Sequence, residues 1–279
     1  MPFISRDQSL TRLRAQIAAR KPIIGAGAGT GISAKFAERG GVDLIIIYNS
    51  GRYRMAGRGS LAGLMPYGDA NAIVMDMARE VLPVVKDTPV LAGVCGTDPF
   101  RMMRVFIPQL REMGFDGVQN FPTVGLIDGQ FRAMLEETGM GIQLEIDMVA
   151  LAHDQGMLTC PYVFDAATAR EFTSAGADVV VTHVNTTVAG SIGVRKAAMS
   201  LDEAVERVQE MHDAAKAVNR DVIVLCHGGP IATPEDAQYV LKRTRGVAGF
   251  FGASSIERLA TEPAIEEMAR RFKGLAIGN

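Results

Sequence analysis

The chain has 279 residues, of which 48% are hydrophobic, and its formal net charge at pH 7 is -2. A chain of this length buries a large core without disulfides. Its charge is near neutral and no helix carries a basic stripe, so electrostatics gives no support for nucleic-acid binding. The apolar runs are too short to cross a bilayer, so we expect no membrane association.

The amino terminus lacks the long apolar core of a signal peptide, which predicts a cytoplasmic protein. No proline-, serine- or charge-rich linker divides the sequence, and we expect a single domain over residues 1–279. Cys95, Cys160 and Cys226 all fall on predicted strands. An odd number of strand thiols is typical of reduced core cysteines and not of a disulfide framework.

Eight apolar runs predict strands, because runs that are apolar throughout are typical of parallel sheet buried on both faces. In chain order they span 22–27, 44–49, 90–96, 117–121, 158–164, 179–185, 222–227 and 247–252. Amphipathic helices are predicted between and after them, at 33–39, 72–85, 99–113, 130–137, 166–175, 201–218, 234–244 and 263–272, with an extra helix at about 141–155. This alternation predicts an α/β protein, a single eight-stranded β/α (TIM) barrel.

A repeated signature marks the entry into several strands: a glycine that ends a helix and an aspartate just before the apolar run. The aspartates are Asp43, Asp116 and Asp178. Residues 36–43 also resemble residues 171–178. Matching halves favour a closed barrel over an open doubly wound sheet.

The last two predicted strands end in glycine-containing stops, which are His227-Gly228-Gly229-Pro230 and Gly252-Ala253-Ser254-Ser255. Glycine lets the backbone approach an anion closely, and the loops after strands seven and eight of a barrel usually hold phosphate. We therefore expect Gly228, Gly229, Gly252, Ser254 and Ser255, with His227, to bind a phosphate or a similar small anion.

The glycine-rich segment 25–31 follows the first predicted strand. Its glycines alternate and do not give G-x-G-x-x-G, and Asp43 precedes the second strand where a nucleotide-binding fold would have an acidic residue at the strand's end. We expect no nucleotide cofactor. A tight loop that leaves room for substrate is the better interpretation.

Polar residues at predicted strand ends are candidates for catalysis, because barrel active sites lie at the carboxyl ends of strands. His183 ends the sixth strand and is a candidate for proton transfer; the alternative is a hydrogen-bonded core histidine. His227 either acts on substrate or only orients the loop of Gly228 and Gly229. Asp98 is a candidate catalytic residue, although Asp98-Pro99 also has the pattern of a helix N-cap.

The second predicted strand ends in Asn49-Ser50-Gly51-Arg52. The arginine's planar fork suits a carboxylate, so we expect Arg52 and Asn49 to hold the carboxylate of a substrate. A solvated loop is the alternative for this arginine cluster, which includes Arg54 and Arg58.

These motifs together resemble the phosphoenolpyruvate hydrolase-like family over nearly the whole chain. The motifs are Ile23-Ile24-Gly25-Ala26-Gly27, Ile45 to Arg52, Gln119-Asn120-Phe121-Pro122-Thr123-Val124-Gly125 and Cys226-His227-Gly228-Gly229-Pro230. The resemblance implies a barrel related to the phosphoenolpyruvate mutase and isocitrate lyase superfamily, whose members bind small α-keto acids or enol-type substrates with magnesium.

The chain departs from that superfamily at the metal. Of the acidic metal ligands expected after the third strand, only Asp98 is present, and the fourth strand ends in Asn120 where a carboxylate is expected. We predict His183, Asp98 and Asn120 as catalytic residues. If substrate oxygens and water supply most of the ligands of a magnesium ion, we expect Asp98 to be its protein ligand.

Two functions follow from these patterns. The first is an enzyme that breaks a C–O–P or C–C bond in a small phosphorylated, enol or keto carboxylic acid; the second is a non-catalytic barrel that binds a small anion and signals to a partner protein. The methionine-rich helices, with Met75, Met77, Met102 and Met103, and a mean hydropathy of +0.13 favour a homo-oligomer. The alternative is that these methionines fill gaps beneath the helices.

Overall fold

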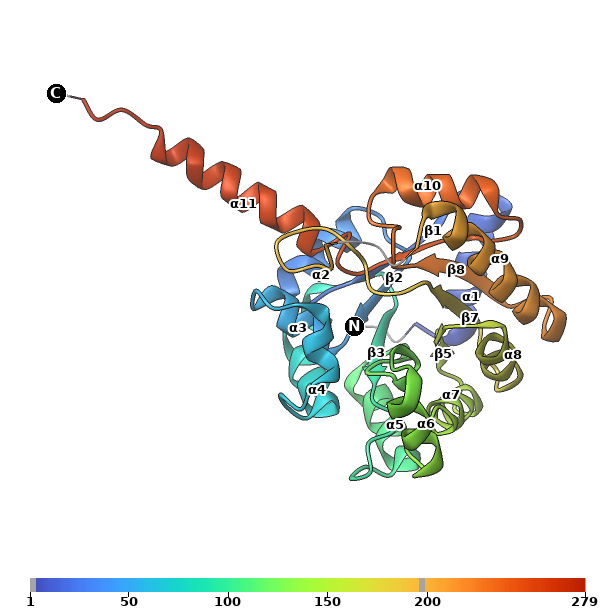
Figure 1. Ribbon diagram of the computed structural model, residues 1–279. Coiled ribbons are helices and arrows are strands. Elements are labelled where there is room, and N and C mark those ends of the chain that lie inside the picture. Colours follow the sequence, from blue (N-terminus) through green and yellow to red (C-terminus); the bar gives the residue numbers. More distant parts are fainter. Residues whose placement is uncertain (1–3, 196–198, 279) are drawn as a thin grey trace.

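In the computed structural model, which describes residues 4–195 and 199–278, helices surround a curled sheet (Figure 1). The sheet is parallel and has nine strands in the described residues, in the order β5-β4-β3-β2-β1-β9-β8-β7-β6. The strands are β1 (Ile23–Gly27), β2 (Leu44–Ile47), β3 (Val90–Val94), β4 (Gly117–Asn120), β5 (Leu158–Thr159), β6 (Tyr162–Val163), β7 (Val179–His183), β8 (Ile223–His227) and β9 (Gly249–Gly252). Nearly every strand residue is buried, which confirms the expected α/β fold with parallel strands.

The helices alternate with the strands along most of the chain. They are α1 (Arg6–Ala18), α2 (Gly31–Arg39), α3 (Asn49–Met55), α4 (Ala70–Val81), α5 (Met103–Met113), α6 (Gly129–Glu137), α7 (Gln143–Asp154), α8 (Ala166–Ser174), α9 (Leu201–Val218), α10 (Pro234–Arg243) and α11 (Arg258–Lys273), with short 3-10 turns η1 (Ser60–Leu64), η2 (Leu82–Val84) and η3 (Val124–Leu126). Figure 1 shows α11 projecting away from the body of the molecule. Within the described residues, no helix is both long and apolar enough to cross a membrane.

The expected fifth strand, 158–164, is divided into β5 and β6, so the fold is TIM-like without eight uninterrupted strands. Pro161 lies between the two halves and has no N–H to donate. The Asn120 side chain replaces a backbone partner here: its Oδ1 accepts from the Tyr162 N–H at 2.7 Å. β5 pairs with β4 and β6 pairs with β7, so the sheet's two edge strands are consecutive in the chain.

The aspartates of the repeated signature join neighbouring strands at their amino ends. Each carboxylate accepts a backbone N–H from a neighbouring strand: Asp43 from Ile24 (2.8 Å), Asp116 from Val90 (2.9 Å) and Asp178 from Thr159 (3.1 Å). Asp116 also accepts from the Ile4 N–H at 2.8 Å. The aspartates of the signature therefore accept hydrogen bonds from backbone N–H groups that have no carbonyl partner in the sheet.

Two helices lie where the sequence predicts none. α1 precedes the first strand and begins with a capping box between Ser5 and Gln8. α3 begins at Asn49, directly after β2, in a segment expected to be a loop. Gly29 and Gly51 explain its position, because a Cβ on Gly29 would lie 2.1 Å from the Gly51 carbonyl oxygen. The glycines bring α3 against the loop after β1.

Replacing Asp116 by alanine is predicted to destabilise the fold. Two buried N–H groups, those of Ile4 and Val90, would lose their acceptor, which costs about 1–3 kcal/mol for each group left unsatisfied. Urea denaturation of Asp116→Ala should show this loss. Asp128→Ala is the control, because Asp128 is exposed and its side chain makes no capping hydrogen bond. Equal midpoints for the two variants would contradict the assigned role.

Candidate active site

A cavity of about 30 Å³ lies at the carboxyl ends of the strands. Its polar lining comes from segments far apart in the sequence, and includes Tyr48, Ser60, Tyr162, His183, His227 and Ser254. A larger cavity, of about 640 Å³, lies on the outside of the sheet between α1 and α10 and holds none of these groups. The smaller cavity is therefore the candidate active site.

His183 and His227 lie side by side on β7 and β8, with ring centroids 4.7 Å apart. The His183 Nδ1 accepts the Asn185 N–H at 3.2 Å, and the His227 Nδ1 contacts the Phe251 carbonyl oxygen. Burial, and then the neighbouring His227, lower the pKa of His183 well below its usual value. Burial also lowers the pKa of His227, to about 4. Both rings are therefore neutral at pH 7.

Tyr162 packs against both histidines, with ring centroids 4.9 Å from His183 and 5.1 Å from His227. Its side chain is almost fully buried, and its hydroxyl makes no hydrogen bond of normal geometry among the described residues, although the Tyr48 side chain lies close enough to affect its pKa. Burial raises the pKa of this phenol well above its usual value. A buried hydroxyl without a partner carries a cost that a bound ligand would remove. No sequence motif singles out this tyrosine.

Arg54, and not Arg52, contacts a residue that lines the cavity, Tyr48. Its guanidinium pairs with Glu257 at 3.1 Å, and both side chains are 1% exposed. It also donates to the Tyr48 hydroxyl at 3.4 Å. Arg52 pairs instead with Asp76 at the surface, where its side chain is 39% exposed. Helix α3 explains the difference, because residues two apart on a helix point in different directions.

Asn49, Ser50 and Gly51 support the site more than they line it. The Asn49 amide donates to the Gly63 carbonyl at 2.9 Å and the Ser50 hydroxyl to the Ser60 carbonyl at 2.6 Å. Of these three residues, Ser50 lines the cavity. The pair of bonds holds η1, and with it Ser60, against the carboxyl end of β2.

Asn120 lies behind the cavity, where its amide is already bonded. Its Nδ2 donates to Glu145 on α7 at 2.7 Å, while its Oδ1 holds the Tyr162 backbone. Glu145 is fully buried and also accepts from Thr123 and from the Val124 N–H. Burial raises the pKa of Glu145 to about 7. The structure thus gives Asn120 a part in placing Tyr162.

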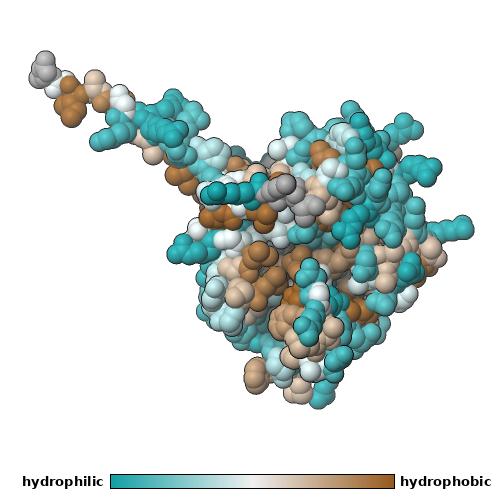
Figure 2. Space-filling model, viewed as in Figure 1, coloured by the Kyte–Doolittle hydropathy of each residue, from teal (hydrophilic) through white to brown (hydrophobic). Residues whose placement is uncertain are grey.

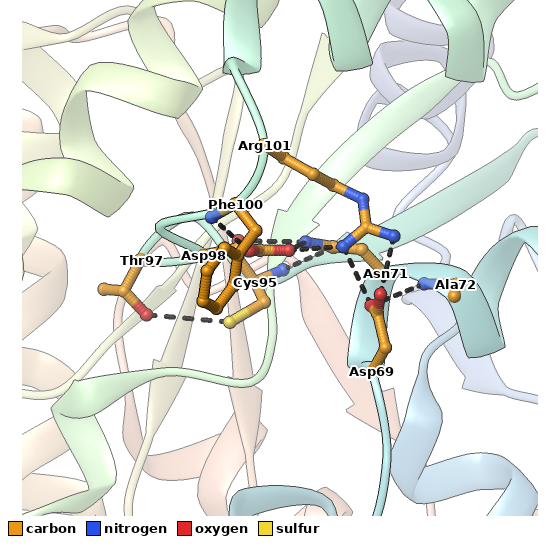
Figure 3. A network of polar contacts seen from close by, with 8 residues as sticks. All are labelled: Asp69, Asn71, Ala72, Cys95, Thr97, Asp98, Phe100 and Arg101. Carbon is orange, nitrogen blue, oxygen red and sulfur yellow. Dashed lines mark hydrogen bonds and ion pairs between the residues drawn. The ribbon is translucent and has the colours of Figure 1, made fainter.

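Asp98 lies in a separate network shown in Figure 3. Its carboxylate accepts from Arg101 at 2.5 Å, from Asn71 at 2.9 Å and from the Phe100 N–H at 2.9 Å. Burial favours a higher pKa for Asp98, but the hydrogen bonds from Asn71, Phe100 and Arg101 outweigh it and lower the pKa. This aspartate does not line the cavity, and α5 begins only at Met103, so it is not the expected N-cap either.

The residues of the two glycine stops lie in different surroundings. Gly228 and Gly229 have φ angles of 85° and 56°, and the Gly229 N–H donates to the Asn185 carbonyl at 2.7 Å. They pack the loop after β8 against the end of β7. Ser254 lines the cavity and lies 3.3 Å from Ser60, whereas Ser255 lines the outer cavity. A Cβ on Gly252 would meet the Phe250 ring.

Other parts of the protein occupy the space beside the glycines after β1. Added Cβ atoms would lie 2.4 Å from the Phe251 ring at Gly25 and 3.1 Å from the Arg54 guanidinium at Gly27. The expectation that this loop leaves room for substrate is wrong, because packing takes up the space.

The family model for phosphoenolpyruvate hydrolase-like proteins matches residues 8–275. The chain belongs to this family. It is 62% identical to the ToMV susceptible protein tm-1(GCR26) of Solanum lycopersicum over 268 residues, which cover 96% of this chain and 35% of that protein. The chain therefore spans about a third of the length of this relative.

Solved structures share the fold of this family member. A phosphonopyruvate hydrolase complex with oxalate and Mg²⁺ has a TM-score of 0.57 and 19% identity, with 95% of this chain and 88% of that chain covered. A 2,3-dimethylmalate lyase, a PEP mutase/isocitrate lyase superfamily member, also has a TM-score of 0.57, with 17% identity and 96% and 90% covered. The chain thus has the fold of that superfamily.

Magnesium is implied by the superfamily, but the residues here do not fit a metal centre. Among the described residues, no three His, Cys, Asp or Glu side chains are grouped to hold an ion. The Asp98 oxygens already bind Arg101, Asn71 and the Phe100 N–H.

Arg54→Met is predicted to destabilise the protein by about 3–5 kcal/mol, because it leaves Glu257 buried without its cation. Arg52→Met is the matched control, and loss of its surface pair should cost about 0–1 kcal/mol. Chemical denaturation of both variants measures the difference. Similar losses would show that the buried pair does not organise the site.

Proposed function

We propose that this phosphoenolpyruvate hydrolase-like protein is an enzyme that acts on a small enol, keto or phosphorylated carboxylic acid in the cavity at the strand ends, breaking a C–O–P or C–C bond. The observation that carries the proposal is the buried Tyr162, which lines the cavity and whose hydroxyl makes no hydrogen bond of normal geometry among the described residues. Two neutral histidines beside it provide groups that can hold or move a proton. We regard the fold as an eight-unit barrel whose fifth strand is divided. The cavity then lies at the carboxyl ends of the strands, where barrel enzymes carry their active sites.

The cavity favours a small substrate. A neighbouring space of about 60 Å³ shares Ser60, Thr186, Thr187 and Ser254 with it. We assign the carboxylate or phosphate of the substrate to these hydroxyls, because the charge of Arg54 is balanced by Glu257 and that of Arg258, which lines the second space, by Glu262. Both spaces together hold only a few heavy atoms in this conformation.

Residues 185–194, called the flap here, cover this region. Thr186, Thr187 and Ile192 line the two spaces. The flap is fixed to the start of α11, where Arg258 donates to the Ala189 carbonyl at 2.9 Å and Glu262 accepts from the Ser191 hydroxyl at 2.6 Å. Opening of the flap would admit substrate, and its closure would exclude water.

A binding protein without catalysis is the second candidate. The hydroxyls of Ser60, Thr186, Thr187 and Ser254 support it, because hydrogen-bond donors alone can bind an anion. The same hydroxyls would then hold a small anion, and the flap would report its presence to a partner protein.

Tyr162→Phe is predicted to lower turnover at least roughly tenfold, since it removes a donor to the reacting molecule, while leaving the melting temperature unchanged or higher. Among the described residues its hydroxyl makes no hydrogen bond of normal geometry that the substitution would remove. The assay uses phosphoenolpyruvate, oxaloacetate and pyruvate with and without Mg²⁺. Tyr67→Phe, at an exposed tyrosine, is the control. If wild-type protein turned over none of these acids above a heat-inactivated sample, the binding-protein function would replace this one.

We also propose a homo-oligomer in which α11 of one copy packs on another. Every residue from Pro263 to 278 is exposed, and Ile265, Met268 and Phe272 recur at the spacing of one helix face. Figure 2 shows apolar side chains among polar ones along this projecting segment. The outer cavity over β1 and β9 has an apolar lining that includes Ile24, Leu241 and Phe250. It is an open apolar groove where a helix following β9 could pack.

Ile265→Asp with Phe272→Asp should convert the oligomer to a monomer, because a carboxylate cannot be buried in an apolar groove without a large cost. Light scattering after size-exclusion chromatography measures the mass. Glu267→Lys, on the opposite face of α11, is the control and should keep the wild-type mass. A monomeric wild-type protein would contradict the assembly.

A further inference from the structure

The two cavity histidines have different hydrogen-bond partners at Nδ1, and these partners fix where each ring carries its proton. A carbonyl oxygen only accepts, so the His227 Nδ1 must donate its hydrogen to Phe251. An amide N–H only donates, so the His183 Nδ1 must accept from Asn185. A neutral imidazole carries one hydrogen. The Nε2 of His227 is then a bare lone pair, and the Nε2 of His183 carries a hydrogen.

From this geometry we propose that His227 is the proton acceptor of the site and that His183 is a hydrogen-bond donor to the substrate. The inference deepens the proposed function and rests on it for the reaction. Both rings line the cavity, and among the described residues neither Nε2 has a hydrogen-bond partner. The residue that the sequence favours for proton transfer, His183, thus receives the other role.

The surroundings keep both rings neutral. The groups that face them are Tyr162 on β6, Phe164 beyond it and, beneath, the Arg54 guanidinium with its partner Glu257. No carboxylate bonds to either ring among the described residues. Burial disfavours the imidazolium in both cases. His227, with an unprotonated Nε2, and His183, with an N–H at Nε2, therefore lie side by side, and their ring centroids are 4.7 Å apart.

The step that this pair supports is removal of a proton from the carbon next to a carbonyl group. The His227 Nε2 takes the proton, and the electron pair of the broken C–H bond forms the C=C bond of an enolate. The carbonyl oxygen receives the negative charge, and the His183 Nε2–H and the Tyr162 O–H donate hydrogen bonds to it. Return of the proton from His227 completes a balanced cycle without a metal or an oxidant.

The first measurement is the tautomer of each ring, by two-bond ¹H–¹⁵N correlation on the full ¹⁵N-labelled chain at pH 7. The signals of the two rings are assigned by their loss in His183→Gln and His227→Gln. We expect His227 protonated at Nδ1 and His183 protonated at Nε2. The same tautomer in both rings, a reversed pair, or an imidazolium at either position would overturn the inference.

The second measurement is exchange of the pyruvate methyl protons in D₂O, followed by ¹H NMR. His227→Gln should slow exchange by roughly 10²–10⁴-fold, the usual contribution of a general base. His183→Gln keeps an N–H near the Nε2 position and should remain roughly tenfold or more faster than His227→Gln. His227→Asn, whose amide can still donate to Phe251, is the second variant if glutamine destabilises the fold, and it should be equally slow.

The outcomes separate the two proposals. If His183→Gln were the more damaging substitution, the assignment of roles would fail although the protein is an enzyme. If the wild-type protein exchanged no methyl protons and turned over no acid, the proposed function would fail, while the tautomers would still show which ring can accept a proton. Exchange by a protein with reversed tautomers would overturn this inference alone.

Discussion

The ion pair between Arg54 and Glu257 holds together the parts of the chain that form the site. Glu257 uses one carboxylate oxygen for the Arg54 guanidinium and the other for the Gly29 N–H, so it joins α3, the loop after β1 and the start of α11. Burying two charges is costly unless all their donors and acceptors are satisfied. Here Arg54 also donates to the Tyr48 hydroxyl oxygen, which leaves the Tyr48 proton free to point elsewhere. The pair thus supports the cavity from beneath.

The cavity above this pair is electrically neutral at pH 7. Burial lowers the pKa values of His183 and His227 and raises that of Tyr162, so none of the three carries a charge. An acidic substrate would bring the only unbalanced charge, and it would meet hydroxyl and imidazole donors. Such donors act strongly where water is excluded. The hydrogen-bond donors of this cavity are therefore neutral side chains.

The sequence predicts most of the strands well because they are continuous apolar runs between turn signals, although it does not predict the division of the fifth strand at Pro161. The aspartate signature at Asp43, Asp116 and Asp178 works through hydrogen bonds within the sheet. The sequence does not predict α3, since Asn49 to Met55 contains two arginines, a glycine and few apolar residues, and the helix depends on the approach of Gly29 to Gly51. The choice between Arg52 and Arg54 depends on that helix. The roles of His183 and His227 depend on backbone groups of Asn185 and Phe251, which no side-chain pattern reveals.

The start of α11 links three features that lie apart in the sequence. Glu257 precedes the helix and binds Arg54 beneath the cavity. Arg258 and Glu262, in its first turns, hold the flap above the cavity. The exposed apolar residues Ile265, Met268 and Phe272 lie further along the same helix, in the part that projects from the body of the molecule (Figure 1). An α-helix is stiff over this length. A force on the projecting part of α11 therefore acts on its first turns, where Glu257 binds Arg54 and where Arg258 and Glu262 hold the flap. The position of α11 is therefore a constraint on the cavity, whatever surface the helix contacts.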